Sequence, residues 1–276
     1  MFRKDRNSQS KVSNISEKTF ECKRDGLTIR GTEYRPQGDR LPIAIVSQGF
    51  MAFQDTVRQY AKALAELGYA AYCFDFNGGS VIKGKSDGKT TEMSVLTEVK
   101  DLEAVIEYVK ALPYTDPDRL LLMGCSQGGF VSALTAAKRK DEVEKLILFY
   151  PALCIPDDAR AGKMMLAKFD PENVPDIVKC GPMKLGKCYV TDVLHMDPYE
   201  EIKGYDGDVL IVHGSNDKIV KPSYSKRAYE TYLSSAGGNK NKQRKIIFKI
   251  IEHGAHGFSK KHDIPAIEML KEFVKD

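Results

Sequence analysis

A serine framed by glycines is the first feature of the sequence that could do chemistry. Gly124-Cys125-Ser126-Gln127-Gly128 has the form G-x-S-x-G, between the apolar residues 120–123 and a helical pattern. A sharp strand-to-helix turn needs glycines two residues before and two after the serine, because side chains there would clash. The motif alone also fits a turn that caps a helix. Its context predicts a nucleophile elbow that exposes the Ser126 hydroxyl.

A serine hydroxyl needs a base, and two later residues have suitable types and order. Asp217 follows a strand expected at residues 209–213, and His256 follows one expected at 246–251. Both residues would then lie at the carboxyl edge of a parallel sheet, where active sites gather. We predict that His256 takes the Ser126 proton and that Asp217 orients the imidazole and stabilises its charged form.

Other residues offer alternatives for these roles. His253 is a second candidate base. A thiol route through Cys125 is a second candidate nucleophile, although that side chain should point away from the elbow tip. His213 is expected to pack near its strand end and support the loop that follows. His195 and His262 are expected at surface or cap positions.

Attack on a carbonyl puts negative charge on its oxygen, which backbone N–H groups typically stabilise. Gln127, the residue after the nucleophile, is one expected donor. Phe50 is the other, because it follows Gln48-Gly49 at the end of a strand expected at 42–47. An ordinary strand-to-loop turn is the alternative at this place. We therefore predict an oxyanion hole formed by the backbone amides of Phe50 and Gln127.

The elements that must position these residues alternate along the chain. Two runs joined by Asp25-Gly26 predict an antiparallel hairpin over 19–23 and 27–34. Further strands are expected at 42–47, 70–76, 119–123, 143–149, 209–213 and 246–251, between helices at 55–67, 95–112, 127–138, 222–234 and 264–275. This alternation predicts an α/β fold: a mostly parallel central sheet with an N-terminal antiparallel hairpin and helices on both faces.

The alternation breaks at residues 151–205, which are rich in proline and glycine. We predict that this stretch is a cap inserted into one core formed by 19–150 and 206–276. Residues 1–18 are predicted to be a flexible N-terminal arm. The cap contains an apolar cluster of Met164, Met165, Leu166 and Phe169. This cluster could line a substrate pocket, since methionine adapts to irregular ligands. Alternatively, it could simply pack the cap onto the core.

Composition fits one large soluble domain of 276 residues, 42% hydrophobic and 29% charged. A net charge of +4 spread along the chain indicates no nucleic-acid partner. No apolar run approaches the roughly 20 residues of a membrane span, so no membrane partner is expected. Residues 1–18 lack a secretory apolar core, which predicts a cytoplasmic protein. The six cysteines lack metal-ligand spacing and are predicted to be reduced thiols. No metal or organic cofactor is implied. A homodimer is compatible with the sequence.

The sequence resembles the α/β-hydrolases, and among them the small bacterial cinnamoyl (feruloyl) esterases and the serine-aminopeptidase-like and monoacylglycerol-lipase-like hydrolases. The resemblance covers most of residues 20–275, through SQGF at 47–50, FDFNGGS at 74–80, GCSQGG at 124–129, HGSNDKIV at 213–220 and HGAHGF at 253–258. It implies an α/β-hydrolase fold with a cap that shapes the acyl pocket. It also implies a triad of Ser126, Asp217 and His256 with Phe50 and Gln127 as oxyanion donors.

Two features depart from the family pattern. Gln48 and Cys125 stand where the family often has histidine, but both changes leave the backbone donors in place. The loop at 78–88 is longer than in the family, so substrate details do not transfer directly.

We predict a serine carboxylic-ester hydrolase that acts on a small-molecule ester through an acyl-Ser126 intermediate. The resemblance favours small or aromatic, hydroxycinnamoyl-type acyl groups. A peptidase or acyl-peptide hydrolase with the same triad is the alternative among enzymes. A non-catalytic binding protein with an α/β-hydrolase fold is the alternative of another class.

Overall fold

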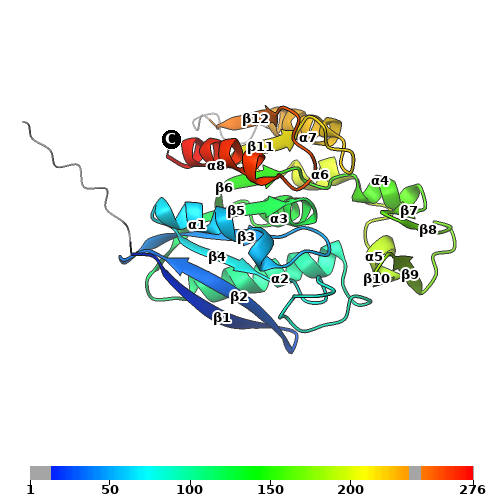
Figure 1. The fold of residues 1–276 in the computed structure, drawn as a ribbon, viewed down its shortest axis with the longest axis horizontal. Coiled ribbons are helices and arrows are strands. Elements are labelled where there is room, and N and C mark those ends of the chain that lie inside the picture. The colour runs from blue at the N-terminus through cyan, green and yellow to red at the C-terminus, as the bar shows by residue number, and fades with distance from the viewer. Residues whose placement is uncertain (1–13, 236–243, 276) are drawn as a thin grey trace, which may run out of the picture.

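One eight-stranded sheet organises the protein (Figure 1). The computed structural model describes residues 14–235 and 244–275. Its elements are β1 (Ser16–Arg24), β2 (Leu27–Arg35), β3 (Leu41–Ser47), the short 3-10 helix η1 (Gln54–Thr56), α1 (Arg58–Glu66), β4 (Ala70–Phe74), α2 (Val95–Lys110), β5 (Thr115–Cys125), α3 (Gln127–Lys138), β6 (Val143–Phe149), α4 (Ile155–Arg160), β7 (Lys163–Met164), β8 (Ala167–Lys168), β9 (Ile177–Cys180), β10 (Met183–Gly186), α5 (Cys188–Thr191), α6 (Pro198–Ile202), β11 (Asp208–Gly214), α7 (Pro222–Ser234), β12 (Ile246–Ile251) and α8 (Lys260–Lys275).

The strand order is β1-β2-β4-β3-β5-β6-β11-β12. β1 and β2 form an antiparallel hairpin, and β2 pairs antiparallel with β4, whereas the remaining pairs are parallel. The predicted fold class is therefore confirmed. β5 is longer than the predicted 119–123, because Thr115 and Asp116 also pair with β3 before a register shift at Pro42/Ile43.

The prediction of a flexible arm over residues 1–18 is wrong for its last three residues, which belong to β1. Ser16 pairs with Arg35 at the start of β1, and its Oγ donates a hydrogen bond to the Arg35 carbonyl at 3.2 Å. The hairpin therefore begins three residues earlier than its apolar pattern indicates. Residues 1–13 of the predicted arm lie outside the described residues.

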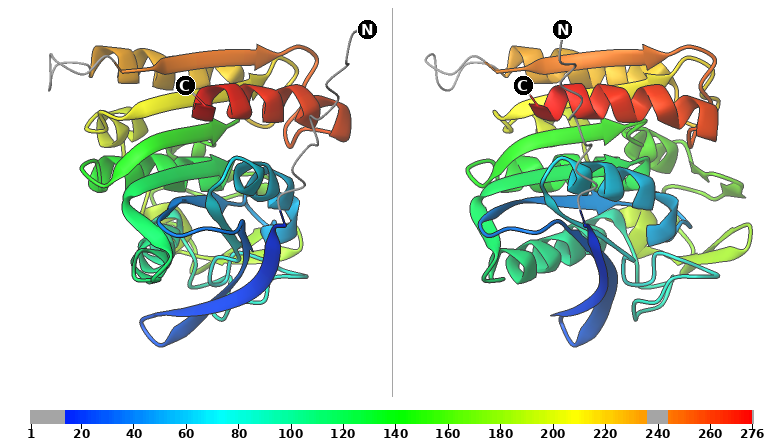
Figure 2. Two further views of the ribbon diagram at one scale, coloured as in Figure 1. Left: turned by 90° about the vertical axis from the view of Figure 1, so that its left-hand side faces the viewer. Right: turned by 60° about the vertical axis from the view of Figure 1, so that its left-hand side comes forward.

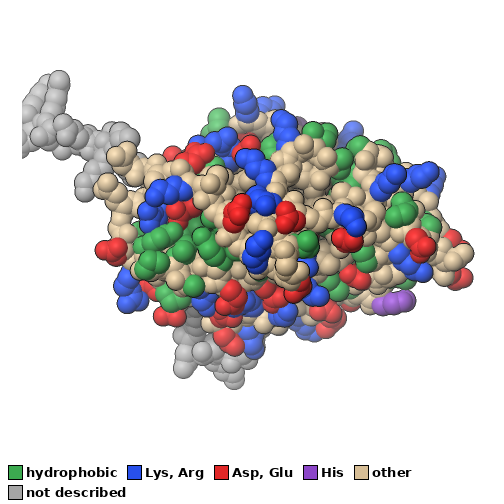
Figure 3. Space-filling view, turned by 90° about the horizontal axis from the view of Figure 1, so that it is seen from below, with side chains coloured by type: hydrophobic (Ala, Val, Ile, Leu, Met, Phe, Trp, Pro, Cys, Tyr) green, Lys and Arg blue, Asp and Glu red, His purple; other side chains and the backbone are tan. Residues whose placement is uncertain are grey.

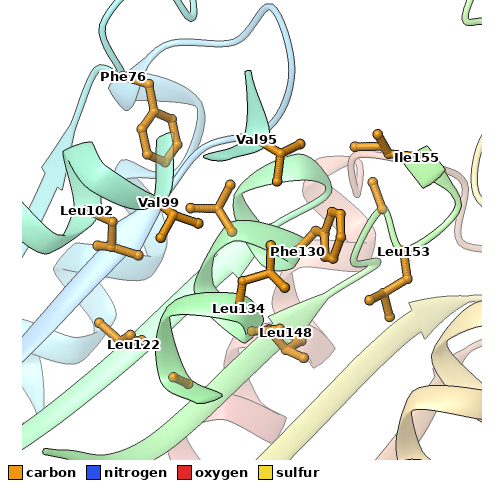
Figure 4. Close-up of a cluster of buried hydrophobic side chains, with 14 of the residues drawn as sticks. Phe76, Val95, Val99, Leu102, Leu122, Phe130, Leu134, Leu148, Leu153 and Ile155 are labelled. Carbon is orange, nitrogen blue, oxygen red and sulfur yellow. The ribbon is translucent and has the colours of Figure 1, made fainter. Parts of the chain in front are cut away.

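Helices cover both faces of the sheet, because alternate side chains of its buried strands point to opposite sides. In β6, Leu146 and Leu148 face one apolar cluster while Ile147 and Phe149 face the other. Helices α2, α3 and α7 pack on the first face, and α1 and α8 on the second (Figures 1 and 2). In the close-up of Figure 4, Phe130 of α3 lies among side chains of the first cluster that include Val95 of α2 and Leu153.

The segment 151–205 interrupts the core between β6 and β11. Its strands form two separate two-stranded hairpins, β7-β8 and β9-β10, and none of them joins the main sheet. The elements from α4 to β10 stand together to the right of the sheet in Figure 1, whereas α6 packs against α3 and α7. Hydrogen bonds tie this segment to the start of α2: Ser94 Oγ donates to Asp192 at 2.5 Å, and Thr90 Oγ1 donates to the Lys184 carbonyl at 2.5 Å.

Charges of both signs are mixed on the surface. On the face seen in Figure 3, lysine and arginine are interspersed with aspartate and glutamate. Within residues 14–235 and 244–275, every helix is too short or too polar to cross a bilayer.

Candidate active site

Four strands deliver the predicted site residues to one edge of the sheet. Parallel strands all end at the same edge, so the loops that follow them meet there. The loops after β3, β5, β11 and β12 carry, in that order, Phe50, Ser126, Asp217 and His256. Ser126 and His256, 130 positions apart in the chain, thus become neighbours.

The turn after β5 has the geometry of a nucleophile elbow. Ser126 adopts φ 53° and ψ −120°, a conformation that is strained for a residue with a side chain. A Cβ at Gly124 would lie 2.1 Å from the Gly128 carbonyl oxygen, and one at Gly128 would lie 2.2 Å from the Gln48 carbonyl oxygen. Only glycine fits these two positions. The Ser126 amide donates to the Phe149 carbonyl at 3.0 Å, which anchors the turn to β6.

The structure joins the serine, histidine and aspartate by two hydrogen bonds. Ser126 Oγ lies 2.8 Å from His256 Nε2, and His256 Nδ1 lies 2.7 Å from Asp217 Oδ2. The His256 side chain is 16% exposed and that of Asp217 is 0% exposed. This arrangement can carry a proton from the serine hydroxyl to the imidazole while the carboxylate holds the Nδ1–H tautomer.

Asp217 is buried yet kept ionised. Burial opposes its charge, but hydrogen bonds from His213 and His256 and from the Val220 amide hold the pKa of Asp217 well below its usual range. The amides of Ile219 and Val220 both donate to Asp217 Oδ1 at 2.9 Å. His213, which is fully buried, lies 3.1 Å from Asp217 Oδ2 through Nε2. His213 thus has the supporting position expected from the sequence.

The other histidines lie away from the serine. His253 is exposed at φ 59°, and its backbone amide donates to Ser215 Oγ at 2.8 Å. His195 is exposed, and the His262 ring, in the first turn of α8, lies 3.0 Å from Ser259 Oγ. His256, rather than His253, is therefore the histidine that reaches Ser126.

Cys125 is unsuited to the alternative thiol route. Its side chain is buried on the sheet face covered by α1 and α8. Burial raises the pKa of the Cys125 thiol to about 12, so the thiol stays protonated and unreactive at neutral pH. Ser126 is the nucleophilic side chain within reach of His256.

Both predicted oxyanion donors lie beside Ser126. Gln127 is the first residue of α3, and the first amides of a helix have no acceptor within the helix. A Cβ on Gly49 would lie 3.0 Å from Ser126 Cβ, so the backbone that leads into Phe50 runs along the serine. Two N–H groups are thereby available next to the nucleophile. Their role as oxyanion donors stays a prediction.

A cavity of about 270 Å³ opens between Ser126 and the segment 151–205. Met164, Met165 and Leu166 line it, and their role in binding a substrate stays a prediction. Phe169 does not line this cavity and instead packs against the main core. The β7-β8 hairpin turns the chain back, so that the Phe169 amide donates to the Gly162 carbonyl at 2.9 Å.

Behind the elbow lies a buried polar network that the sequence did not predict. Gln127 Nε2 donates to Glu98 of α2 at 2.8 Å, and Gln127 Oε1 accepts from the hydroxyl of Tyr189 of α5. All three side chains are buried. The network joins the elbow to the core and to the segment 151–205. One signal could have found it, because Glu98 shares the apolar stripe of its helix with Val95 and Val99.

Glu98 should make the protein lose stability as the pH rises. Burial raises the pKa of its carboxyl from 4.5 to about 8, so between these values the folded state binds more protons than the unfolded state. The contribution of the neutral Glu98 carboxyl to the free energy of unfolding is therefore largest below about pH 4.5 and decreases towards pH 8. In Glu98→Gln this fall is removed. From pH 5 to pH 8 we expect the variant to gain on the order of 2 kcal/mol relative to the wild type.

Denaturant unfolding at pH 5 and pH 8 measures this difference. Glu272→Gln, at an exposed position of α8, is the matched control and should follow the wild type at both pH values. Parallel pH profiles for the wild type and Glu98→Gln would show that Glu98 is ionised in the folded protein.

The sheet order, the strained elbow serine and the placement of the site at the carboxyl edge define an α/β-hydrolase. Residues 42–203 match the family described as serine aminopeptidase, S33, and the chain belongs to this family.

The structure is similar to Est1E from Butyrivibrio proteoclasticus with ferulic acid bound: 26% sequence identity, a TM-score of 0.81, and coverage of 93% of this chain and 100% of that one. In sequence, the chain is 28% identical over 131 residues to a 31.7 kDa protein of the traX-finO intergenic region of Escherichia coli, 47% of this chain and 44% of that one. It is 29% identical over 118 residues to the polyketide transferase ATR5 of Stachybotrys chlorohalonatus, 42% of this chain and 38% of that one. The chain spans less than half the length of these two curated relatives.

Proposed function

We propose that the protein is a serine hydrolase that cleaves a small-molecule carboxylic ester through an acyl-Ser126 intermediate. The observation that carries this proposal is the hydrogen-bonded chain from Ser126 through His256 to Asp217, with distances of 2.8 and 2.7 Å, beside a cavity. A nucleophile, its base and an orienting carboxylate are the parts that acyl transfer needs.

The reaction has two halves. His256 Nε2 takes the Ser126 proton as Oγ bonds to the carbonyl carbon, and the Phe50 and Gln127 amides bind the oxyanion. Collapse of this intermediate breaks the bond to the alcohol oxygen, which His256 protonates. Water then attacks the acyl-serine with His256 again as base, and the carboxylic acid leaves with Ser126 restored.

The segment 151–205 acts in this proposal as a cap that holds the acyl group. The cavity beneath it offers mostly apolar side chains, and its volume of about 270 Å³ is near the lower end for small-molecule sites. Both features favour a small or single-ring acyl group. The similarity to Est1E, whose structure holds ferulic acid, supports hydroxycinnamoyl-type esters in particular.

One observation favours the second candidate function, a peptidase. Asp158 lines the acyl cavity together with Lys163 and Lys218, and its carboxyl would be the partner for a substrate ammonium group. The triad would act on an amide by the same steps.

Matched substrates separate the two functions. We expect the wild type to hydrolyse methyl cinnamate and methyl ferulate with kcat/KM at least roughly 100-fold above the matching anilides and aminoacyl anilides, since an amine leaves less readily than an alcohol. A preference for aminoacyl anilides would identify a peptidase. No turnover of either series, together with no fluorophosphonate adduct, would support the non-catalytic binding protein.

A further inference from the structure

Ser126 also borders a second cavity, and no residue of the segment 151–205 lines it. It has a volume of about 330 Å³ and lies between the loop after β3, the start of α1 and the loop before α8. Side chains that line it include Thr56, Val57, Gln59, Tyr60, Tyr150 and Phe258. The two cavities share only Phe50 and Ser126 among the described residues that line them.

The catalytic groups divide between the two cavities. Gln127 lines the first cavity, whereas His256 lines the second. In the tetrahedral intermediate the carbonyl carbon carries the serine oxygen, the oxyanion, the acyl chain and the alcohol oxygen. The oxyanion must face the backbone amides, and the alcohol oxygen must face His256 Nε2 to receive its proton. The alcohol therefore leaves on the side that His256 lines.

We propose that this second cavity is the subsite for the alcohol portion of the ester, while the acyl chain occupies the first cavity. This assignment rests on the proposed ester hydrolysis. The assignment extends the proposed function by giving the leaving alcohol a separate, defined site.

The walls of the second cavity favour a neutral, apolar or aromatic alcohol. Apart from the catalytic His256, none of the described side chains that line it is acidic or basic, whereas Asp158, Lys163 and Lys218 line the first cavity. The hydroxyl of Tyr60 is turned away to Asp263 Oδ1 at 2.5 Å, which leaves its ring as lining. Thr56 Oγ1 likewise donates to the Phe53 carbonyl, at 2.7 Å.

These walls belong to the core of the fold. The Tyr60 ring packs edge-on against Phe149 of β6 with centroids 5.0 Å apart, and Tyr150 packs edge-on against Phe258 at 4.8 Å. Tyr150 also packs edge-on against the His256 ring at 4.9 Å. The alcohol subsite is therefore built independently of the segment 151–205. Substitutions in the two cavities should change selectivity for different halves of the ester.

Esters of one acid with two alcohols test this division. Methyl cinnamate and benzyl cinnamate differ in the size of the alcohol, and methanol and benzyl alcohol are nearly equal as leaving groups. Ala52, in the loop after β3, is half-buried and lines only the second cavity. In Ala52→Phe, the ratio of kcat/KM for benzyl cinnamate to that for methyl cinnamate should fall at least tenfold, because the new ring fills the space for the benzyl group.

The matched control enlarges a side chain of the first cavity. Leu166→Trp should leave the benzyl-to-methyl ratio within threefold and instead change the ratio of kcat/KM for methyl cinnamate to that for methyl acetate. Thr56→Trp, at the exposed rim of the second cavity, repeats the Ala52 test if Ala52→Phe fails to fold.

The outcomes distinguish this inference from the proposed function. A fall of the benzyl-to-methyl ratio only in the second-cavity variants supports the alcohol subsite. If the wild type hydrolyses both esters but the ratio stays constant in Ala52→Phe and Thr56→Trp, or falls in Leu166→Trp instead, the subsite assignment is overturned while ester hydrolysis stands. If the wild type hydrolyses no ester, the proposed function fails and the alcohol subsite fails with it.

Discussion

Ser126→Ala should abolish labelling by a fluorophosphonate and lower kcat for ester hydrolysis by roughly 10⁴-fold or more. The substitution removes the only atom that forms the acyl intermediate, while the oxyanion amides and both cavities stay in place. Binding and the remaining oxyanion stabilisation should leave a small residual rate. Intact mass spectrometry after treatment with the probe reports the adduct directly, with one adduct expected on the wild type.

Cys125→Ala is the matched control for this experiment. The thiol is buried with a pKa raised to about 12, so we expect the variant to keep its adduct and to stay within severalfold of wild-type turnover. An adduct that persists in Ser126→Ala and disappears in Cys125→Ala would show that the wrong nucleophile has been assigned.

Asp217→Asn should lower kcat by roughly 10³- to 10⁴-fold without removing any atom that contacts substrate. The carboxylate accepts at Oδ1 from two backbone amides and at Oδ2 lies near His213 and His256. An asparagine would keep its oxygen towards the amides and point its NH₂ group at the two histidines. His256 would then carry its proton on Nε2, and it could no longer accept the proton of Ser126.

The rate of labelling by the fluorophosphonate and kcat for methyl cinnamate both measure this effect. Asp206→Asn, at an exposed position before β11, should stay within threefold of the wild type. Near-normal kcat in a folded Asp217→Asn protein would mean that another group orients His256.

Much of the fold could be predicted because its signals are local. The apolar strands and the helical spacing between them indicate the βα alternation, and the structure contains the eight predicted strands in one sheet. The steric rule at Gly124 is equally local, since a side chain there would meet the Gly128 carbonyl of the same turn. The rule that parallel strands end at one edge then placed the loops of Asp217 and His256 near Ser126.

Other features depend on contacts between distant segments. The hydrogen bond from Gln127 to Glu98 joins residues 29 apart in the chain, and that from Tyr189 to Gln127 joins residues 62 apart. The partners of the buried Glu98 do not follow from neighbouring residues alone. The second cavity likewise exists only where the start of α1 faces the loop before α8.

The sequence by itself determined the class of fold, the elbow and the order of the residues that could perform acyl transfer, because these follow from backbone sterics and hydrophobic periodicity over a few residues. Only the tertiary structure decided which histidine reaches Ser126, which carboxyl is buried, and how two separate cavities meet at the nucleophile. Those outcomes depend on how side chains from distant elements pack against one another, and local sequence patterns do not specify which elements come into contact.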